Sequence, residues 1–549
     1  MNATTTRSVP APAGQAPGPG HPVAPGQAPA PGQVPAPADA PAPADAPAPA
    51  ARQLPPGFLL GAATAAFQVE GAAWTDGRTD SIWDAFCRQP GAVLGGDDGA
   101  VAADHYHRYR EDVALMAELG LGAYRFSTSW ARVRPDDGPT NPAGLDFYSR
   151  LVDELLAHDL VPWLTLYHWD LPQALQDRGG WTDRDTAYRF ADYAVAVHEA
   201  LGDRVRVWTT LNEPWCSSFL SYAGGEHAPG RTDPTEAIAA AHHLLLGHGL
   251  AARALRERDG DATLGITLNF TVADPADPAD PADVDAARRI DGAHNRIFLD
   301  PIFRGEYPAD VLADMAAHWP AGLVHDGDLA TIAAPIDVLG VNYYNGGLVA
   351  GPAAPDGEPA DGGAAAAGDV AAVGADPASA DGGRTTDGGP GQVLPGRRRR
   401  SPFVGSEDVR SVPRGLPTTA MGWEVQPEGL TRLLTRLHEE YTGPAGVALY
   451  VTENGAAYDD EPDAAGFVRD DERVAYVRDH LHAVLDAVEA GADVRGYFVW
   501  SLLDNFEWAF GYSKRFGIVR VDYETLERVP KASALWYRDV ARARAVPTA

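Results

Sequence analysis

Apolar, β-branched runs alternate with amphipathic stretches along most of the chain. Residues 161–170 (VPWLTLYHWD) and 206–214 (RVWTTLNEP) are typical of buried strands, because most of their side chains are apolar or β-branched. The stretch before the first of them, 150–160 (RLVDELLAHDL), carries apolar residues at the spacing of one helix face. This alternation predicts repeated strand–helix units, which build a parallel sheet.

Strand-like runs of this kind recur at regular intervals through the chain. They are residues 58–71, 123–130, 161–170, 206–214, 264–269, 337–344, 449–455 and 494–504. With helical regions between them, these runs predict an α/β fold: a single (β/α)8 TIM barrel with long βα loops. A doubly wound open sheet is the alternative, but no Gly-rich phosphate-binding sequence follows the first strand.

Two long segments lack the large apolar side chains that a core needs. Residues 1–54 are rich in Pro and Ala, and we expect a disordered tail because such a segment cannot offset its ordering entropy. Residues 346–405, rich in Ala, Gly and Asp, are expected to form a low-complexity insertion after the sixth strand. The barrel domain is then expected to span residues 55–545. A shorter biased stretch, 274–283 (DPADPADPAD), is expected to be a solvated loop.

Composition narrows the classes of partner and the cellular location. The formal net charge of −32 argues against nucleic acid and anionic membranes as partners. The two cysteines, Cys87 and Cys216, form neither a disulfide framework nor a metal-ligand spacing. No apolar stretch is long enough for a membrane span or has the character of a secretory signal, so we expect a cytoplasmic protein.

Polar and aromatic side chains gather where the predicted strands end. In a (β/α)8 barrel the functional site lies at the C-terminal ends of the strands. Amides, imidazoles and carboxylates bind hydroxyl groups, and indole rings stack on sugar rings. With almost no Lys among them, these residues favour a neutral, polyhydroxylated ligand. They are Gln68, Glu70, Arg125, His168, Trp169, Asp170, Asn212, Glu213, Asn269, Asn342, Tyr343, Tyr344, Glu453, Asn454, Trp500, Asp504, Glu507 and Trp508.

Two of these strand ends share one design. TTLNEP at 209–214 and VTENG at 451–455 each place a Glu beside an Asn after a β-branched run. Two carboxyl groups that face each other across one pocket can divide the roles of acid and nucleophile, because their environment can hold one protonated and the other ionised. Retaining glycoside hydrolysis requires such a pair about 5–5.5 Å apart.

The sequence resembles glycoside hydrolase family 1, the retaining β-glucosidases and their relatives, from about Pro55 to Arg544. The resemblance rests on motifs that occur in the family's order. They are FQVEG, YRFSTSW, YHWDLP, TLNEP, GVNYY, MGWEVQPEGL, VTENG and DNFEWAFGYSKRFG. The N-terminal tail and the 346–405 insertion are not family features.

The resemblance implies a role for each matching residue. Glu213 would be the general acid/base and Glu453 the nucleophile. Tyr344 would donate a hydrogen bond to Glu453 and Arg125 would lie near it, which favours the ionised nucleophile. No metal and no cofactor are implied. The residues that would bind the substrate's sugar ring are Gln68, His168, Asn212, Tyr344, Trp500, Glu507 and Trp508.

The expected activity is hydrolysis of terminal, non-reducing β-D-glucosyl residues by double displacement. The substrates would be β-glucosides and short oligosaccharides such as cellobiose. A β-galactosidase or β-fucosidase of the same family is one alternative. A non-catalytic sugar-binding barrel is another, but such a protein should have lost one carboxylate, and both Glu213 and Glu453 are present.

Other candidate residues have simpler explanations. His242, His243 and His248 suggest a metal site, but their spacing does not place two ligands at i and i+4, so helix packing is favoured. Cys216 follows the NEPW sequence, yet nothing nearby in the sequence supplies a base, so a packed thiol is favoured. The four arginines at 397–400 are typical of a solvated loop.

Overall fold

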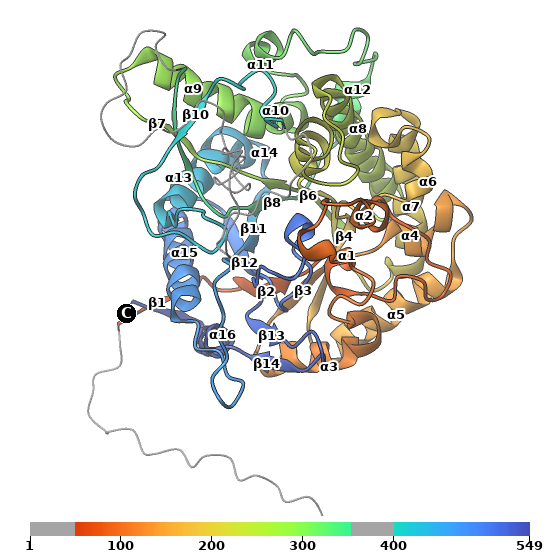
Figure 1. The fold of residues 1–549 in the computed structure, drawn as a ribbon, viewed down its shortest axis with the longest axis vertical. Helices are drawn as coiled ribbons and strands as arrows, with labels where there is room; N and C mark the ends of the chain where they lie inside the picture. Colours follow the sequence, from red (N-terminus) through yellow and green to blue (C-terminus); the bar gives the residue numbers. More distant parts are fainter. Residues whose placement is uncertain (1–49, 353–399, 549) are drawn as a thin grey trace, which may run out of the picture. The chain divides into compact units, whose positions relative to one another are not determined.

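The structure is a computed structural model that describes residues 50–352 and 400–548. Eight parallel strands close into a barrel in chain order, so the predicted (β/α)8 fold is confirmed (Figure 1). The barrel strands are β2 (Leu59–Ala63), β3 (Ala123–Ser127), β4 (Val161–Tyr167), β5 (Val207–Asn212), β6 (Thr263–Asn269), β8 (Val338–Asn342), β11 (Ala448–Asn454) and β12 (Val494–Trp500).

Each predicted strand run overlaps one barrel strand, but the first predicted run is too long. Strand β2 ends at Ala63, and the short helix α1 (Ala66–Val69) follows within the predicted run 58–71. Gln68 therefore lies on a helix rather than at a strand end. A short apolar run fits a buried strand and a buried helical turn equally well, so periodicity could not separate them.

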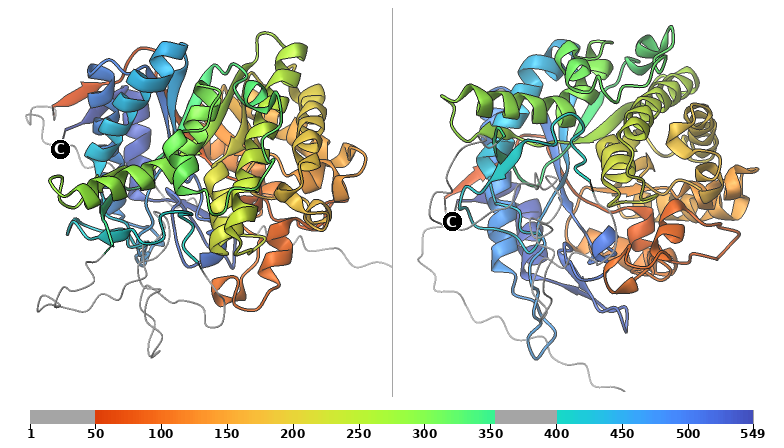
Figure 2. Two further views of the ribbon diagram at one scale, coloured as in Figure 1. Left: turned by 90° about the horizontal axis from the view of Figure 1, so that it is seen from above. Right: turned by 45° about the horizontal axis from the view of Figure 1, so that its top comes forward.

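Helices surround the barrel and cover the outer faces of its strands (Figures 1 and 2). Their amphipathic patterns explain the packing: α13 (Pro427–Leu437) begins with Pro427 in its first turn and buries Leu430, Leu433, Leu434 and Leu437. The other long helices are α3 (His105–Glu118), α5 (Pro142–Ala157), α7 (Asp185–Leu201), α8 (Pro234–Arg258), α9 (Pro281–Asp291), α15 (Asp471–Glu489) and α16 (Ala532–Ala543).

Shorter elements decorate the loops between these units. The short helices are α2 (Ile82–Cys87), α4 (Trp130–Val133), α6 (Gln173–Gln176), α10 (Ile297–Phe303), α11 (Ala309–Asp314), α12 (Asp328–Ile332) and α14 (Gly443–Ala445), and a π-helix covers Cys216–Gly224. The short strands are β1 (Ala51–Gln53), β7 (Ala273–Pro275), β9 (Gly347–Ala350), β10 (Arg410–Val412), β13 (Val519–Val521), β14 (Arg528–Pro530) and β15 (Ala545–Pro547).

The low-complexity stretches contain more regular structure than their composition predicts. Strand β9 lies inside the expected insertion and pairs with β7 and β10, while residues 353–399 lie outside the described part of the chain. The stretch 274–283 includes part of β7 and the start of α9. The Asp280 carboxylate caps α9 by accepting the Ala282 N–H at 2.9 Å. The repeated Asp and Pro residues therefore form the N-terminus of a helix here as well as a loop.

The predicted boundary of the N-terminal tail, residue 54, lies too late in the sequence. Strand β1 (Ala51–Gln53) pairs antiparallel with β15, and Leu54 is buried. The barrel unit therefore begins at about residue 50. Residues 1–49, for which disorder is expected, lie outside the described residues.

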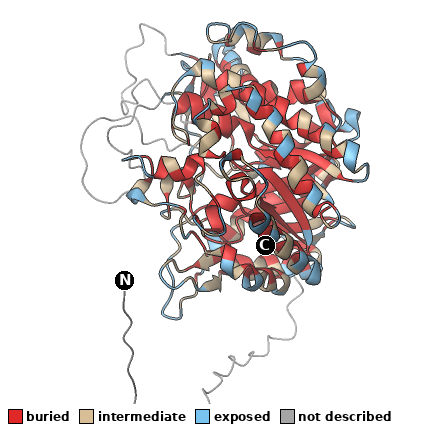
Figure 3. Ribbon diagram, turned by 90° about the vertical axis from the view of Figure 1, so that its right-hand side faces the viewer, coloured by how far each residue is buried: buried red, intermediate tan, exposed pale blue. Residues whose placement is uncertain are grey.

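Aromatic side chains fill part of the barrel interior. The Trp163 ring on β4 lies 4.9 Å from the ring of Tyr450 on β11 and 5.2 Å from that of Phe498 on β12, so strands on opposite sides meet through their side chains. Gly61 on β2 is required by this packing, because a Cβ atom there would lie 2.6 Å from the Phe498 ring. Figure 3 shows the barrel strands buried over most of their length. The interior is a packed core, and the site is built where the strands end.

Candidate active site

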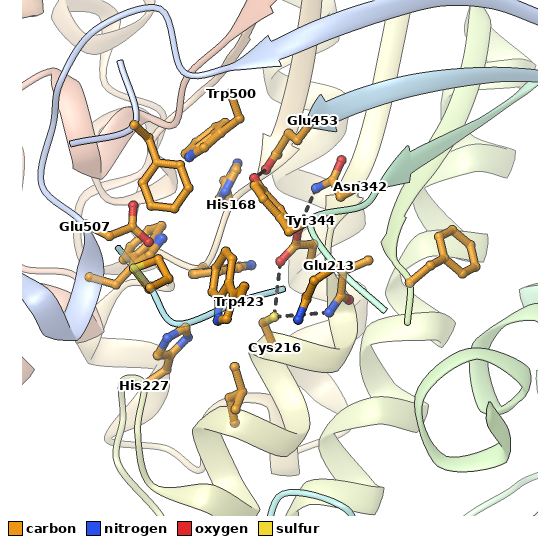
Figure 4. A pocket seen from close by; sticks show the side chains of 18 of the residues that line it. His168, Glu213, Cys216, His227, Asn342, Tyr344, Trp423, Glu453, Trp500 and Glu507 are labelled. Atoms are coloured by element: carbon orange, nitrogen blue, oxygen red, sulfur yellow. Dashed lines mark hydrogen bonds between the residues drawn. The ribbon is translucent and has the colours of Figure 1, made fainter. Parts of the chain in front are cut away.

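A pocket of about 790 Å³, including its open mouth, lies at the C-terminal ends of the strands (Figure 4). The residues that line it come from loops that follow most of the barrel strands, as the sequence predicts for this fold. They are His168, Trp169, Glu213, Cys216, Leu220, His227, Asn269, Phe270, His294, Asn342, Tyr344, Asn345, Met421, Trp423, Glu453, Trp500, Glu507, Trp508, Phe510 and Phe516.

Glu213 reaches the pocket through a tight turn after β5. The Glu213 N–H donates to the Thr267 carbonyl at 2.9 Å, and the residue has a φ of 48°, in the left-handed region. The Cys216 N–H then donates back to the Glu213 carbonyl at 3.0 Å. A left-handed non-glycine residue is strained by about 1 kcal/mol or more, and such strain concentrates at functional sites. The buried strand therefore ends by turning its carboxyl group into the pocket.

Glu453 lies at the end of β11 between a cation and a phenol. The Arg125 guanidinium donates to Oε1 of Glu453 at 2.5 Å, and the Tyr344 hydroxyl donates to Oε2 at 2.8 Å. Both contacts match those expected from the resemblance. They place positive charge and a hydrogen-bond donor on this carboxylate, which stabilises its ionised form.

A chain of hydrogen bonds connects the two glutamates. Besides Glu453, Arg125 donates to Oδ1 of Asn212 at 2.7 Å. Asn342 donates to the same oxygen at 3.1 Å and to Oε1 of Glu213 at 2.6 Å. Three barrel strands, β3, β5 and β8, thus hold both carboxyl groups. Asn342 is a strand-end residue to which the sequence analysis assigned no role.

The two carboxyl groups differ in their surroundings and hence in protonation. Burial, together with the nearby charge of Glu453, raises the pKa of Glu213 to about 8. Burial also raises the pKa of Glu453, but the charge and hydrogen bond of Arg125 and the hydroxyl of Tyr344 oppose that rise. The direct partners of Glu213, Asn342 and Cys216, are neutral. Glu453 is therefore the group that ionises first, while Glu213 keeps its proton.

Gln68 and Glu507 form a second polar cluster at the pocket. The Gln68 amide donates to the Phe506 carbonyl at 2.8 Å, to Asn505 at 3.0 Å and to Oε2 of Glu507 at 3.4 Å. Burial and the charges of Glu453 and Glu213 raise the pKa of Glu507 to about 8. Glu507 lines the pocket, and Gln68 contacts Glu507.

His168, Trp500 and Trp508 form an aromatic wall. The His168 ring lies nearly parallel to both indoles, with centroid distances of 5.8 Å to Trp500 and 6.0 Å to Trp508. His168 also hydrogen-bonds to the Asn212 amide at 3.0 Å, and burial holds its pKa well below its usual value. The two indoles are almost entirely buried yet line the pocket, so they both pack in the core and face the cavity.

Other strand-end residues have structural partners instead. Glu70 accepts hydrogen bonds from Arg132 at 3.0 Å and from the Tyr148 hydroxyl at 2.7 Å, and it does not line the pocket. Asn454 accepts from the Tyr497 hydroxyl at 2.6 Å. A polar residue at a strand end can face the pocket or the surrounding core, and its sequence position does not distinguish the two.

Cys216 is buried, as a packed thiol would be, but the expectation that no base lies nearby is wrong. Its Sγ lies 3.1 Å from Oε2 of Glu213, so a carboxyl group is in direct contact with the thiol. The left-handed turn at Glu213 brings residue 216 back over residue 213, which linear sequence does not reveal. Asn269, one of the predicted strand-end residues, lines the pocket. His294 and Trp423 also line it without having been predicted as site residues, although Trp423 lies in the MGWEVQPEGL motif.

The three histidines of α8 have partners within the packed structure. His242 contacts Asp328 at 3.0 Å, His243 donates to the Trp181 carbonyl at 3.0 Å, and His248 contacts Thr210 at 2.7 Å. Among residues 50–352 and 400–548, no group of three or more side chains could hold a metal ion. In the same part of the chain, no helix has the length and apolar character of a membrane span. Arginines 397–399 lie outside the described residues.

A closed parallel barrel with two carboxyl groups of unequal protonation in a polar, aromatic pocket defines a glycoside hydrolase. Comparison with known proteins identifies the family. The profile described as "Glycosyl hydrolase family 1" matches residues 50–546, and the chain belongs to this family.

Close relatives cover nearly the whole barrel. The chain is 51% identical to thermostable beta-glucosidase B of Thermobispora bispora, over 89% of this chain and 90% of the relative. It is 46% identical to a bifunctional beta-D-glucosidase/beta-D-fucosidase of Bifidobacterium breve, over 88% and 97%. Among solved structures, the psychrophilic beta-glucosidase BglU from Micrococcus antarcticus superposes with a TM-score of 0.81 at 54% identity, over 89% and 97% of the two chains.

Proposed function

We propose that this protein is a retaining β-glucosidase that acts on β-glucosides and short β-gluco-oligosaccharides such as cellobiose. One observation carries the proposal: two buried carboxyl groups share a pocket, but among the residues that the structure describes only Glu453 contacts a cation, Arg125. This asymmetry supplies one ionised and one protonated carboxyl group near neutral pH. The names of relatives with 41–51% identity, which include several β-glucosidases, support the choice of sugar.

In the first step, the ionised Glu453 attacks the anomeric carbon of the sugar. A bond forms between a Glu453 oxygen and that carbon while the bond to the glycosidic oxygen breaks, and Glu213 transfers its proton to the departing oxygen. In the second step, Glu213 accepts a proton from water, the water oxygen bonds to the anomeric carbon, and Glu453 leaves as a carboxylate. Two inversions at one carbon retain the β-configuration.

The substrate's sugar ring would be held by the polar and aromatic groups around Glu453. Gln68, His168, Asn212, Tyr344 and Glu507 would bind its hydroxyls, and Trp500 and Trp508 would stack on its ring. Glu507 supports this role because its raised pKa lets it donate as well as accept hydrogen bonds. These groups suit an uncharged sugar and require neither metal nor cofactor.

Activity on β-D-fucosides is a second candidate, favoured by the name of the Bifidobacterium breve relative. A panel of β-D-glucoside, β-D-fucoside and β-D-galactoside substrates with one leaving group separates these activities by kcat/KM. We also propose a cytoplasmic location, which is supported by two cysteines that are both unpaired and buried.

The role of Glu453 is tested by substitution and chemical rescue. Glu453→Gly should lose nearly all activity, by about 10⁴-fold or more, because the proposed mechanism then lacks the carboxylate that forms the covalent intermediate. Azide entering the vacated space should restore turnover and give the α-glucosyl azide. NMR of the azide product gives its stereochemistry. Activity of the variant near the wild-type level would refute the mechanism.

Glu213→Ala tests the acid/base role and serves as the matched control for azide. This variant should lose far more rate on cellobiose than on a dinitrophenyl glucoside, because an activated leaving group needs little protonation. Azide should here attack the glycosyl-enzyme and give the β-azide. The reversed pair of azide products would mean that the two roles are exchanged.

A further inference from the structure

The Cys216 thiol lies on the oxygen of Glu213 that Asn342 leaves available. Asn342 donates to Oε1 at 2.6 Å, and the thiol lies 3.1 Å from Oε2 (Figure 4). Cys216 begins the π-helix Cys216–Gly224, three residues after Glu213, and its backbone N–H is bonded to the Glu213 carbonyl. The same turn that directs the carboxyl group into the pocket therefore fixes the sulfur against it.

The Asn269 amide contacts the sulfur and is itself hydrogen-bonded to His294. The Asn269 amide on β6 lies 3.6 Å from Sγ and 3.1 Å from Nε2 of His294. The His294 ring stacks on Trp215, with a centroid distance of 4.1 Å. Burial lowers the pKa of His294 to about 3, so this imidazole is neutral at neutral pH. The groups beside the thiol are thus uncharged apart from Glu213.

We propose that Cys216 is a positioning residue that holds Oε2 of Glu213 in both protonation states of the catalytic cycle. The inference rests on the proposed role of Glu213 as acid/base. A thiol can accept a hydrogen bond from the protonated acid and donate one to the carboxylate. Glu213 is protonated before the first step and ionised after it, so its partner must serve both forms.

The weakness of the thiol as a donor suits the acid form of Glu213. A hydroxyl at this position would stabilise the carboxylate of Glu213 more strongly and so lower its pKa, which would leave less of the acid form at neutral pH. Burial and the nearby charge of Glu213 raise the pKa of Cys216 well above its usual value, so the sulfur keeps its hydrogen. The thiol therefore contributes a hydrogen bond without adding a second charge.

Several other charged or titratable groups also act on Glu213. Within the described residues, only Asn342 and Cys216 make hydrogen bonds to its side chain. Four groups interact with Glu213 through space: Glu453 on β11, Arg125 on β3, Tyr344 after β8 and Glu507 after β12. The histidines that line the same pocket are His168, His227 and His294, and Glu226 acts on Cys216. All of them remain in place when only residue 216 is changed.

The test measures kcat/KM for an alkyl β-glucoside between pH 5 and 10 in Cys216→Ser and Cys216→Val. The hydroxyl should move the basic limb of the profile down by about 1 pH unit, and the apolar valine should move it up. With a wild-type pKa of about 8, the serine variant at pH 8 would be about fivefold slower, because the protonated fraction falls from about one half to about one tenth.

Cys87→Ser is the matched control, since Cys87 is the other buried thiol and lies on α2 outside the pocket. Its profile should follow that of the wild type. If the basic limb stays within 0.2 unit in either Cys216 variant that folds, the proposal is wrong. Glu213→Gln, measured through its residual activity on the same alkyl β-glucoside, identifies the group behind this limb. If the basic limb persists in Glu213→Gln, the proposed role of Glu213 itself is wrong. If the limb is lost in Glu213→Gln but does not shift in the Cys216 variants, only the proposed role of Cys216 is wrong.

Discussion

Three buried carboxyl groups, Glu213, Glu453 and Glu507, share one pocket, and burial raises the pKa of each. A carboxyl group whose pKa is higher in the folded state than in the unfolded state binds its proton more tightly when folded. For Glu213 and Glu507, whose folded pKa is about 8, this stabilising effect is complete below the unfolded pKa of about 4.5 and is lost as the pH rises through 8. The site therefore makes the fold less stable toward alkaline pH.

This linkage predicts how Glu507→Gln changes stability with pH. The neutral amide does not ionise, so the free energy of unfolding of the variant should rise relative to that of the wild type between pH 5 and pH 8. The relative gain should be about 1 kcal/mol per pH unit, and at most 1.4, because one pKa unit corresponds to 1.36 kcal/mol. Urea unfolding at pH 5, 6, 7 and 8 measures it.

Glu111→Gln is the control for this comparison, because the Glu111 side chain is 66% exposed on α3. Its difference from the wild type should be nearly the same at each pH. Parallel curves for Glu507→Gln and the wild type would show that Glu507 is ionised throughout this range in the folded protein.

At the scale of elements, a buried ion network fixes the loop that follows β12. Lys531, at the start of α16, donates to Asp460 and also to Asp504, the latter at 2.7 Å. Asp504 also accepts from Arg515 at 2.7 Å and from the Gly517 N–H at 3.0 Å. This network holds the chain just before Glu507 and Trp508, so a helix on the outside of the barrel helps to place groups inside the pocket.

Lys531→Met should therefore affect both stability and substrate binding. The change leaves two buried carboxylates without one of their cations, and removing one partner of a buried pair costs about 3–5 kcal/mol. We expect a lower midpoint of urea unfolding and a raised KM for glucosides. Arg495→Met, which breaks the exposed pair with Asp493, should change the free energy of unfolding by less than about 1 kcal/mol. An equal effect of both substitutions would contradict a special role for the network.

At the scale of the whole molecule, the start of the barrel unit is joined to its end. Strand β1 pairs with β15, and Arg52 forms ion pairs with Asp486 at 2.7 Å and Glu489 at 2.9 Å on α15. Leu54 is only 6% exposed. These contacts belong to residues that the composition of the chain assigned to a disordered tail.

Two truncations test where the folded unit begins. Deleting residues 1–49 should leave Tm and kcat/KM nearly unchanged, because this Pro/Ala-rich segment has few apolar side chains to bury. Deleting residues 1–54 should lower Tm by several degrees, since β1, the ion pairs of Arg52 and the burial of Leu54 are all lost; burying one leucine contributes about 1.5–3 kcal/mol. Calorimetry on both forms measures the difference. Equal Tm values for both would mean that β1 adds nothing to stability.

The sequence by itself determined the barrel and the location of its site. Parallel strands covered on both faces are continuous apolar runs, so the number and order of the strands could be read from local pattern alone. The two Asn–Glu pairs could be found because each interrupts such a run at its C-terminal end. These signals are local, so they can be recognised without knowing which distant residues come into contact.

Only the tertiary structure decided which of these side chains meet and which of them hold protons. Gln68 reaches Glu507 across 439 positions of sequence, and Arg125 reaches Glu453 across 328. The contact between Cys216 and Glu213 depends on the left-handed backbone conformation of Glu213, which a glutamate in the sequence does not predict. Protonation depends on burial and on charges brought together from different strands. Both exist only once the barrel has closed.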